Sequence, residues 1–259
     1  MPPLSKLNRS IKGKIAIVTG AASGMGRATA YVFADEGARL AIVDRSADAL
    51  AEVEKEIRDA GGDVRAWCID IAEDGSVEGM VEEAAQHFGG IDILVNNAGV
   101  SFGGPIDADE YPERWGKTFA VNLTAHTRFI RAALPYLTKC GAGRIVNIAS
   151  TEGMGATKFG SAYTASKHGV IGLTRSLALE FGELGITVNC ICPGPIKTGM
   201  TAGIPDDKKT KFARRRVPLR RYGDPEEVAH GTLNFVLPAA SYMNGQALAV
   251  DGGMMAQNT

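Results

Sequence analysis

The sequence predicts an α/β protein built on one doubly wound parallel sheet of seven strands, with helices on both faces. Short runs rich in Val and Ile alternate along the 259 residues with stretches of helical periodicity. These runs are apolar throughout rather than at every second residue, which is typical of parallel strands buried on both faces. No linker, internal repeat or low-complexity segment divides the chain. We therefore expect a single domain over residues 1–259.

The predicted elements follow one another in a strand–helix rhythm. Strands are expected at 14–20, 39–44, 63–70, 91–97, 143–150, 187–192 and 246–252. A helix after the first strand ends at Gly37, and the next covers 46–61, with Ser46 as its N-cap and Gly61 at its end. Apolar stripes mark this second helix (Leu50, Val53 and Ile57) and the helix after the third strand (Val77, Met80, Val81, Ala84 and Phe88).

Composition narrows the class of protein. A formal net charge of −1 produces no global field that would attract nucleic acid or an anionic membrane. The N-terminal stretch lacks a secretory signal pattern, and the apolar runs are too short to span a bilayer. The cysteines (Cys68, Cys140, Cys190 and Cys192) and the four histidines lack metal-ligand spacing. We expect a cytoplasmic protein with reduced, mostly buried thiols, no metal site, and no nucleic-acid or membrane partner.

A serine, a tyrosine and a lysine indicate acid–base chemistry. Ser150 closes the fifth predicted strand, and Tyr163 lies four residues before Lys167 in a predicted helix. This spacing places the tyrosine and the lysine one turn apart on one helical face. The ammonium is expected to favour the phenolate and so to lower the pKa of Tyr163 from about 10 toward neutrality. A tyrosine tuned in this way can act as a general acid or base.

A glycine-rich turn after the first strand indicates a dinucleotide site. Gly20, Gly24 and Gly26 allow a sharp turn and a close approach of the backbone to a pyrophosphate at a helix N-terminus. Asp44 closes the second strand, where a carboxylate can bind both ribose hydroxyls and would repel a 2′-phosphate. NAD is therefore favoured over NADP, although Arg45 next door could pair with a 2′-phosphate.

At this point the chain resembles the classical short-chain dehydrogenase/reductase family, from about residue 13 to residue 253. The matching motifs are TGAASGMG at 19–26, Asp70, NNAG at 96–99, Asn122 in VNL, Ser150, Tyr163-x-x-x-Lys167, PGPIKT at 193–198 and DGG at 251–253. The resemblance implies a Rossmann-like fold and a nicotinamide cofactor.

The resemblance also implies a role for each catalytic residue. Tyr163 would be the acid/base, and Ser150 would hydrogen-bond the substrate oxygen. Lys167 would lower the pKa of Tyr163 and hold the nicotinamide ribose. Asn122 would kink its helix and position a water molecule in a proton relay.

The same resemblance implies a set of cofactor contacts. Asp70 and the backbone of Ile71 would hold the adenine, Asn97 would lie along the cofactor, and Ile196 and Thr198 would meet the nicotinamide carboxamide. The full expected set is Gly20, Ser23, Gly24, Met25, Gly26, Asp44, Asp70, Ile71, Asn97, Ala98, Gly99, Tyr163, Lys167, Pro193, Ile196 and Thr198.

One segment interrupts the rhythm before the last helix. Residues from about 195 to 222 are expected to form a substrate lid, and the pocket is expected to include Glu152, Met154 and Phe159. Eight basic residues fall within 208–221. They form either a solvated helix face or a site for an anionic substrate, such as a carboxylate or an acyl-thioester carrier.

The predicted function is reversible hydride transfer between NAD(H) and a secondary alcohol or ketone, a small-molecule substrate. One alternative is a 3-oxoacyl-carrier reductase, which residues 218–229 resemble. An alternative of another class is a non-catalytic dinucleotide-sensing or nucleic-acid-binding module that uses the basic segment. The resemblance further implies a homotetramer to which the tail after Asp251 contributes, although a frayed terminus would explain that tail equally well.

Overall fold

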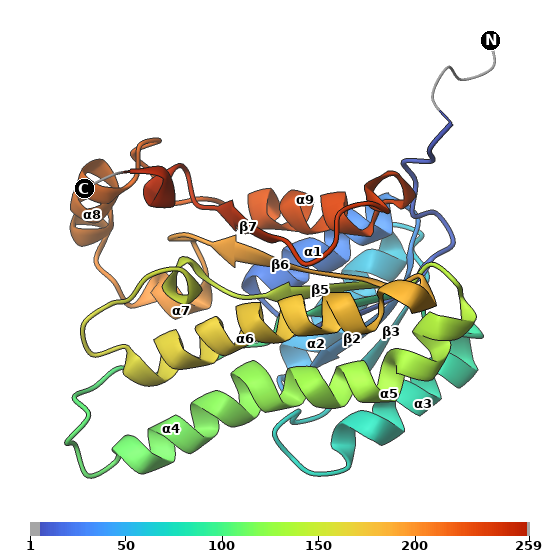
Figure 1. Cartoon of the computed structure of the whole chain (residues 1–259), viewed down its shortest axis with the longest axis horizontal. Helices are drawn as coiled ribbons and strands as arrows, with labels where there is room; N and C mark the ends of the chain where they lie inside the picture. Colours follow the sequence, from blue (N-terminus) through green and yellow to red (C-terminus); the bar gives the residue numbers. More distant parts are fainter. Residues whose placement is uncertain (1–5, 258–259) are drawn as a thin grey trace.

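Seven parallel strands form one sheet in the order β3-β2-β1-β4-β5-β6-β7 (Figure 1). This computed structural model describes residues 6–257. The strands are β1 (Ile15–Thr19), β2 (Arg39–Asp44), β3 (Val64–Cys68), β4 (Ile93–Asn96), β5 (Arg144–Ile148), β6 (Thr187–Pro193) and β7 (Ala247–Val250). The predicted doubly wound sheet is confirmed, with each strand inside or within one residue of its predicted range.

The order of the strands reverses at β1. This strand pairs with β2 on one side and with β4 on the other, so that Val18 lies beside Ile42 and Val95. Because all pairs are parallel, the carboxyl ends of the strands share one edge of the sheet. Ligands of such sheets bind at that edge, beside the point of reversal.

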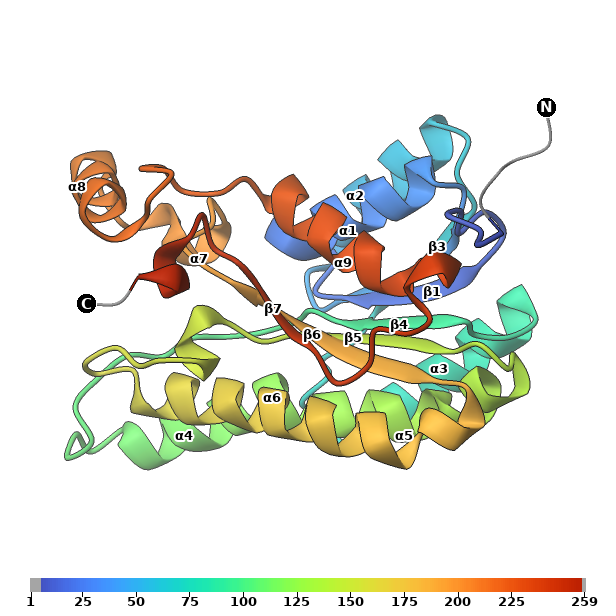
Figure 2. The ribbon, with the colours of Figure 1, turned by 45° about the horizontal axis from the view of Figure 1, so that its top comes forward.

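Helices cover both faces of the sheet (Figure 2). On one face lie α1 (Gly24–Asp35), α2 (Ala47–Asp59) and α9 (Pro225–Val236), and on the other lie α3 (Ser76–Phe88), α4 (Tyr111–Phe119), α5 (Ala125–Lys139) and α6 (Ser161–Glu180). A π-helical turn, η1 (Ala120–Thr124), joins α4 to α5. The shorter helices α7 (Gly199–Ala202) and α8 (Asp206–Arg216) lie beyond the sheet edge, with the 3₁₀ turns η2 (Thr151–Gly153), η3 (Gly182–Leu184), η4 (Pro238–Ala240) and η5 (Met254–Ala256) in loops.

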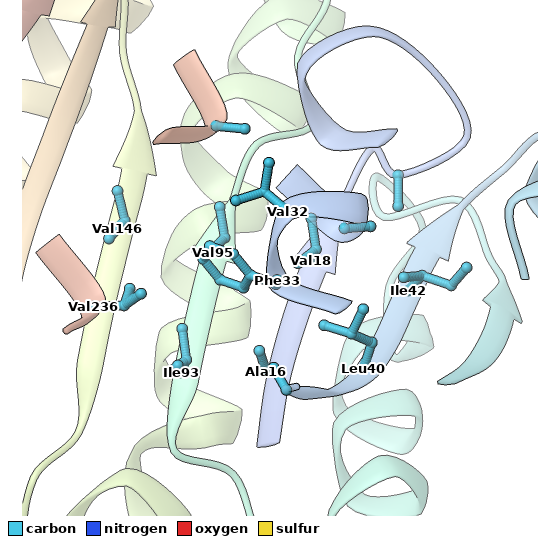
Figure 3. Packing of buried hydrophobic residues seen from close by; sticks show 14 of the residues in the cluster. Ala16, Val18, Val32, Phe33, Leu40, Ile42, Ile93, Val95, Val146 and Val236 are labelled. Carbon is cyan, nitrogen blue, oxygen red and sulfur yellow. The ribbon is translucent and has the colours of Figure 1, made fainter. Parts of the chain in front are cut away.

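Alternate residues of the central strands supply two cores. Ala16 and Val18 of β1 pack with Phe33 of α1 on one face (Figure 3), while Ile15 and Ile17 pack on the other face against α3 and α5. Every residue of β1 is buried, whereas the edge strands β3 and β7 are only partly so. Burial on both faces explains why the central strands are apolar without alternation.

One local prediction is confirmed in position, and another is wrong. Ser46 is the N-cap residue of α2 as predicted, but its side chain makes no capping hydrogen bond; its backbone N–H instead donates to Asp44 Oδ1 at 3.0 Å. The four cysteines are free, yet only Cys190 and Cys192 are buried, and Cys68 is exposed. Cys68 is exposed because it lies on β3, an edge strand that has a neighbouring strand on one side only. The apolar stripes of α2 and α3 are buried as predicted.

Residues 195–222 form an excursion away from the sheet, and the two ends of this segment, which we call its neck, are bonded to each other. Ile196 forms a bridge with Gly223, and the Gly223 N–H donates to the Pro195 carbonyl at 2.9 Å. Helices α7 and α8 fill the excursion. The C-terminal tail packs against its base, since Leu219 N–H donates to Gly252 O and Gln257 Nε2 donates to Arg216 O. A frayed end is therefore wrong for residues up to 257, whereas 258–259 lie outside the described residues.

Candidate functional site

The predicted catalytic side chains come from three elements that meet at the carboxyl edge of the sheet. Asn122 belongs to η1, Ser150 follows β5 as the N-cap of η2, and Tyr163 and Lys167 lie on α6. Asn122, Ser150 and Lys167 are buried, while Tyr163 is partly exposed. A buried amide, hydroxyl and amine at a ligand-binding edge require polar partners, and these partners define the site.

Asn122 ties the π-helical turn to the loop after β4. Its Oδ1 accepts from Val100 N–H at 2.8 Å, and its Nδ2 donates to the Val100 carbonyl at 2.9 Å and to Ser166 Oγ at 3.1 Å. The side-chain amide therefore pairs with a backbone amide as a neighbouring strand would. The helix continues through η1 with a π-type bond from Ala125 N–H to Ala120 O. π-Bulges of this kind are frequent at functional sites.

Lys167 lies beneath the site with most of its hydrogen-bonding capacity unused. Its Nζ donates to the Ile148 carbonyl at 2.8 Å, and the described residues offer no other acceptor for its remaining donors. A Cβ added to Gly99 would lie 3.6 Å from this Nζ and 3.4 Å from Asn122 Oδ1. Glycine at position 99 therefore keeps the space above the amine open.

The pKa of Tyr163 does not follow the prediction. Burial raises the pKa of Tyr163 above its ordinary value; the Ser150 side chain opposes this rise and Glu152 adds to it. Lys167 Nζ lies 5.6 Å from the centre of the Tyr163 ring and donates to a backbone carbonyl instead of the phenol oxygen. Burial also lowers the pKa of Lys167 to about 8. The predicted lowering is wrong for the protein by itself, because desolvation is the largest influence on the phenol and the opposing influence comes from Ser150 and not from Lys167.

In the turn after β1, each of the three glycines is needed for a different structural reason. Gly20 has a φ of +68°, and a Cβ there would lie 2.8 Å from Ala98 Cα. At Gly26 a Cβ would overlap the Gly20 carbonyl, and at Gly24 it would press on the methyl group of Thr198. Ser23, the N-cap of α1, makes no side-chain capping bond, so the amides of Gly24 and its neighbours Met25 and Gly26 begin the helix without a side-chain partner. This cradle fits a pyrophosphate.

Asp44 is held beside that cradle, at the end of β2. Its Oδ2 accepts from Ala22 N–H at 3.1 Å, and its Oδ1 accepts from Ser46 N–H at 3.0 Å. The carboxylate therefore joins the glycine-rich turn to the start of α2. Arg45 beside it is exposed and forms no ion pair within the described part of the chain.

Polar side chains also form hydrogen bonds within the other loops at the carboxyl edge of the sheet. Asn97 Nδ2 donates to the Thr19 carbonyl at 2.8 Å, while its buried Oδ1 has no partner among the described residues. Asp70 Oδ1 accepts from Ala72 N–H at 2.9 Å, and Ile71 is buried in the core. Asn97 Oδ1 and Asp70 Oδ2 are thus acceptors in these loops without a partner among the described residues.

The loop after β6 completes the edge. Pro193 ends that strand, Ile196 is buried at the neck of the excursion, and Thr198 caps α7 against Gly24. Nearby, Glu152 accepts from Thr164 Oγ1 at 2.8 Å and from Thr157, so its carboxylate is already paired. Met154 and Phe159 are exposed, and Gly104 N–H joins its loop to the Phe159 carbonyl.

The sequence prediction missed the residues that position these groups. Thr19 Oγ1 accepts from the N–H groups of Asn97 and Ala98, and Ser166 Oγ donates to the Tyr163 carbonyl at 2.7 Å. Ser166 lies three residues after Tyr163, and that spacing could have revealed it. His126 is one of the four histidines that lack metal-ligand spacing, yet only 2% of its surface is exposed.

Two features are lacking among the described residues, a cluster of metal ligands and a membrane-spanning helix. Within 6–257 no three His, Cys, Asp or Glu side chains are grouped closely enough to hold a metal ion. Over the same range, no helix combines the length and the apolar character that crossing a membrane demands.

The fold and the site together define an oxidoreductase that uses a nicotinamide dinucleotide. Residues 20–255 match the family model described as enoyl-(acyl carrier protein) reductase. The chain is 39% identical to 2,5-dichloro-2,5-cyclohexadiene-1,4-diol dehydrogenase LinX of Sphingobium indicum, over 94% of this chain and 96% of the relative. It is 37% identical to 3-oxoacyl-[acyl-carrier-protein] reductase FabG of Thermotoga maritima, over 95% of this chain and 99% of the relative.

A solved structure agrees with these relatives. L-Sorbose reductase from Gluconobacter frateurii, complexed with NADPH and L-sorbose, superposes with a TM-score of 0.91 at 31% identity, over 97% of this chain and all of that one. The chain therefore belongs to the short-chain dehydrogenase/reductase family, the NAD(P)-dependent oxidoreductases that interconvert alcohols and carbonyl compounds.

Proposed function

We propose that this protein oxidises a secondary alcohol and reduces the corresponding ketone, with Tyr163 as the acid/base. The observation that carries this proposal is the convergence of Asn122, Ser150, Tyr163 and Lys167 on the edge that holds the glycine cradle. A nicotinamide dinucleotide, when bound, supplies or accepts the hydride. The protein's own side chains handle the proton and orient the substrate.

Each residue has one task in this proposal. Tyr163 Oη gives its proton to the carbonyl oxygen in reduction and takes it from the hydroxyl in oxidation. Ser150 donates a hydrogen bond to the same oxygen. Lys167 stabilises the phenolate and directs its free donors toward ribose hydroxyls, and Asn122 holds the site together and positions a relay water. Because its pKa is raised, Tyr163 is protonated at neutral pH, which is the form that ketone reduction requires.

Removing the Tyr163 hydroxyl tests the proposal. Tyr163→Phe is expected to lower kcat for a ketone substrate by at least about a thousandfold, the upper range for a general acid, while cofactor affinity stays within about threefold. The measurements are steady-state reduction of a ketone panel and fluorescence titration of NADH. Tyr136→Phe, a partly buried tyrosine of α5 away from the site, is the matched control. Full activity of Tyr163→Phe would refute the proposal.

We further propose that NAD is preferred over NADP. Asp44 supports this choice, because two backbone amides hold its carboxylate in place and the negative charge opposes a 2′-phosphate. NADPH in the related L-sorbose reductase favours the other cofactor. Arg45 also favours NADPH, since its guanidinium carries no partner carboxylate within residues 6–257.

The substrate class is proposed from α8. Lys208, Lys211, Arg214, Arg215 and Arg216 are exposed on this helix and form no ion pair within the described residues. Several of them, with Asp207 and Thr210, line a shallow hollow of about 550 Å³. This surface supports an anionic substrate, either a carboxylate or, as in the related FabG, a 3-oxoacyl chain on a carrier protein. LinX, which is named for a neutral diol, supports the uncharged alternative.

We also propose that the chain acts as a cytoplasmic homotetramer with residues 195–222 as its lid. Edge strand β7 exposes Leu248, and the loop before it exposes Tyr242 and Met243. Apolar side chains beside the open edge of a sheet support an interface between copies. The lid proposal rests on the closed neck at Ile196 and Gly223, which lets α7 and α8 move as one unit.

A further inference from the structure

His126 is a buried histidine that the proposed mechanism does not use. It lies in the first turn of α5, is 2% exposed, and neither ring nitrogen has a hydrogen-bond partner among the described residues. A buried imidazole without polar partners loses its hydration without replacement, which destabilises the folded protein. Its place in the molecule therefore calls for a polar ligand.

The neighbours of His126 are the catalytic residues. It follows Asn122 by four residues on one continuous helix, so the two side chains share a face. Lys167 from α6 is the charged group that acts on it, and Ala98, in the loop after β4, is a backbone neighbour whose geometry falls short of a hydrogen bond. Cys190 and Cys192 of β6 act on Lys167 in turn and oppose the lowering of its pKa.

Two unsatisfied groups thus face the same loop, because Ala98 lies at His126 and a Cβ on the next residue, Gly99, would lie 3.6 Å from Lys167 Nζ. Lys167 has donors without acceptors, and His126 has a ring nitrogen able to accept. Burial, followed by the field of Lys167, lowers the pKa of His126 to about 3, so the imidazole is neutral and keeps one lone pair. Buried waters typically make about three hydrogen bonds to groups of this kind.

We propose that His126 is a positioning residue that holds a water molecule against Lys167 Nζ and so keeps this ammonium charged beneath Tyr163. The inference rests on the proposed roles of Tyr163 and Lys167. Without the water, the ammonium would be less solvated and more easily deprotonated. The phenolate of Tyr163 would then lose part of its stabilisation, and alcohol oxidation would require a higher pH.

The test compares pH profiles of kcat/KM for alcohol oxidation. His126→Phe removes both nitrogens at similar volume and is expected to move the acidic limb up by about one pH unit, a tenfold loss on the limb with the plateau retained. His126→Gln retains a donor and an acceptor and is expected to stay within about 0.3 unit of the wild type. Phe129→Leu, a core change on the same helix, is the matched control for packing.

Each outcome decides the inference. A shifted limb in His126→Phe, rescued in His126→Gln and absent in Phe129→Leu, supports it. An unshifted limb in His126→Phe overturns it, and so does an equal shift in Phe129→Leu. If His126→Phe does not fold, a high-resolution crystal structure of the wild type decides, because density for a water between His126 and Lys167 supports the inference and its lack overturns it. Activity in Tyr163→Phe would refute the proposed function instead.

Discussion

Asp44 shows how much one residue's surroundings matter for cofactor choice. The sequence predicts this residue as a ribose ligand, and the structure gives it backbone partners on both sides. These bonds do not exclude a ligand, because each carboxylate oxygen has a second lone pair. They hold the negative charge at the end of β2, where a 2′-phosphate would have to approach.

Neutralising that charge is expected to change the cofactor preference. The wild type should have a kcat/KM for NAD⁺ at least about tenfold above that for NADP⁺, and Asp44→Asn should raise the NADP⁺ value by about tenfold, as removal of roughly 1.4 kcal/mol of repulsion would. Asparagine keeps an acceptor for one backbone amide. Asp48→Asn, an exposed acid on α2, is the control and should change neither value. A wild type that prefers NADP⁺ would contradict the NAD proposal.

Helix α8 is an exposed element whose basic residues have two possible explanations, helix stability and ligand binding. Only Ala213 of this helix is buried, and its last turn carries Arg214, Arg215 and Arg216. Basic residues in the last turn stabilise a helix through its dipole, typically by 0.3–1 kcal/mol each at low salt. This effect alone accounts for the arginines without a ligand, so kinetics must separate stability from binding.

Neutralising the last turn of α8 is expected to act on anionic substrates alone. The triple variant with Gln at 214, 215 and 216 should raise KM for a keto acid by at least about fivefold at low salt and leave kcat and a neutral cyclic ketone within about twofold. The effect should fade at high ionic strength. A triple change of the exposed Arg9, Lys12 and Lys139 to Gln controls for net charge. Equal changes for neutral and anionic ketones would favour the solvated-face interpretation.

Elements were more predictable than the contacts between them. Strand β1 and the stripe of α3 are encoded by their own residues, because burial and periodicity leave a local pattern. The π-helical turn around Asn122 has no such pattern. It exists because the Asn122 side chain pairs with Val100, a residue 22 positions earlier. The kink was expected from the family resemblance alone.

At the scale of the whole molecule, the site lowers stability. Lys167 is buried with one acceptor, and its pKa falls from 10.5 to about 8. A base whose pKa is lowered by folding binds more protons when unfolded, between these two values. Stability therefore rises as pH rises through that window, and at neutral pH the protein carries the full cost of a buried charge.

This linkage is measurable against a variant that cannot titrate. Between pH 8 and 10.5, the free energy of unfolding of the wild type should rise by roughly 3 kcal/mol relative to Lys167→Met. Urea denaturation at four pH values measures the difference. Lys139→Met, which removes an exposed lysine of α5, should stay parallel to the wild type throughout. Parallel curves for Lys167→Met would show that Lys167 is not desolvated in the folded state.

The sequence by itself determined the parallel sheet, its strands, the glycine-rich turn and the placement of Tyr163 and Lys167 one turn apart on a helix, because these depend on local periodicity and on spacing within one turn or helix. Only the tertiary structure decided the electrostatics. The spacing of Tyr163 and Lys167 predicted a lowered pKa for the tyrosine. In the folded protein the lysine amine donates to the Ile148 carbonyl, and burial raises the pKa of Tyr163. Desolvation depends on every element that packs around a residue, and so does the isolation of His126 beside Lys167.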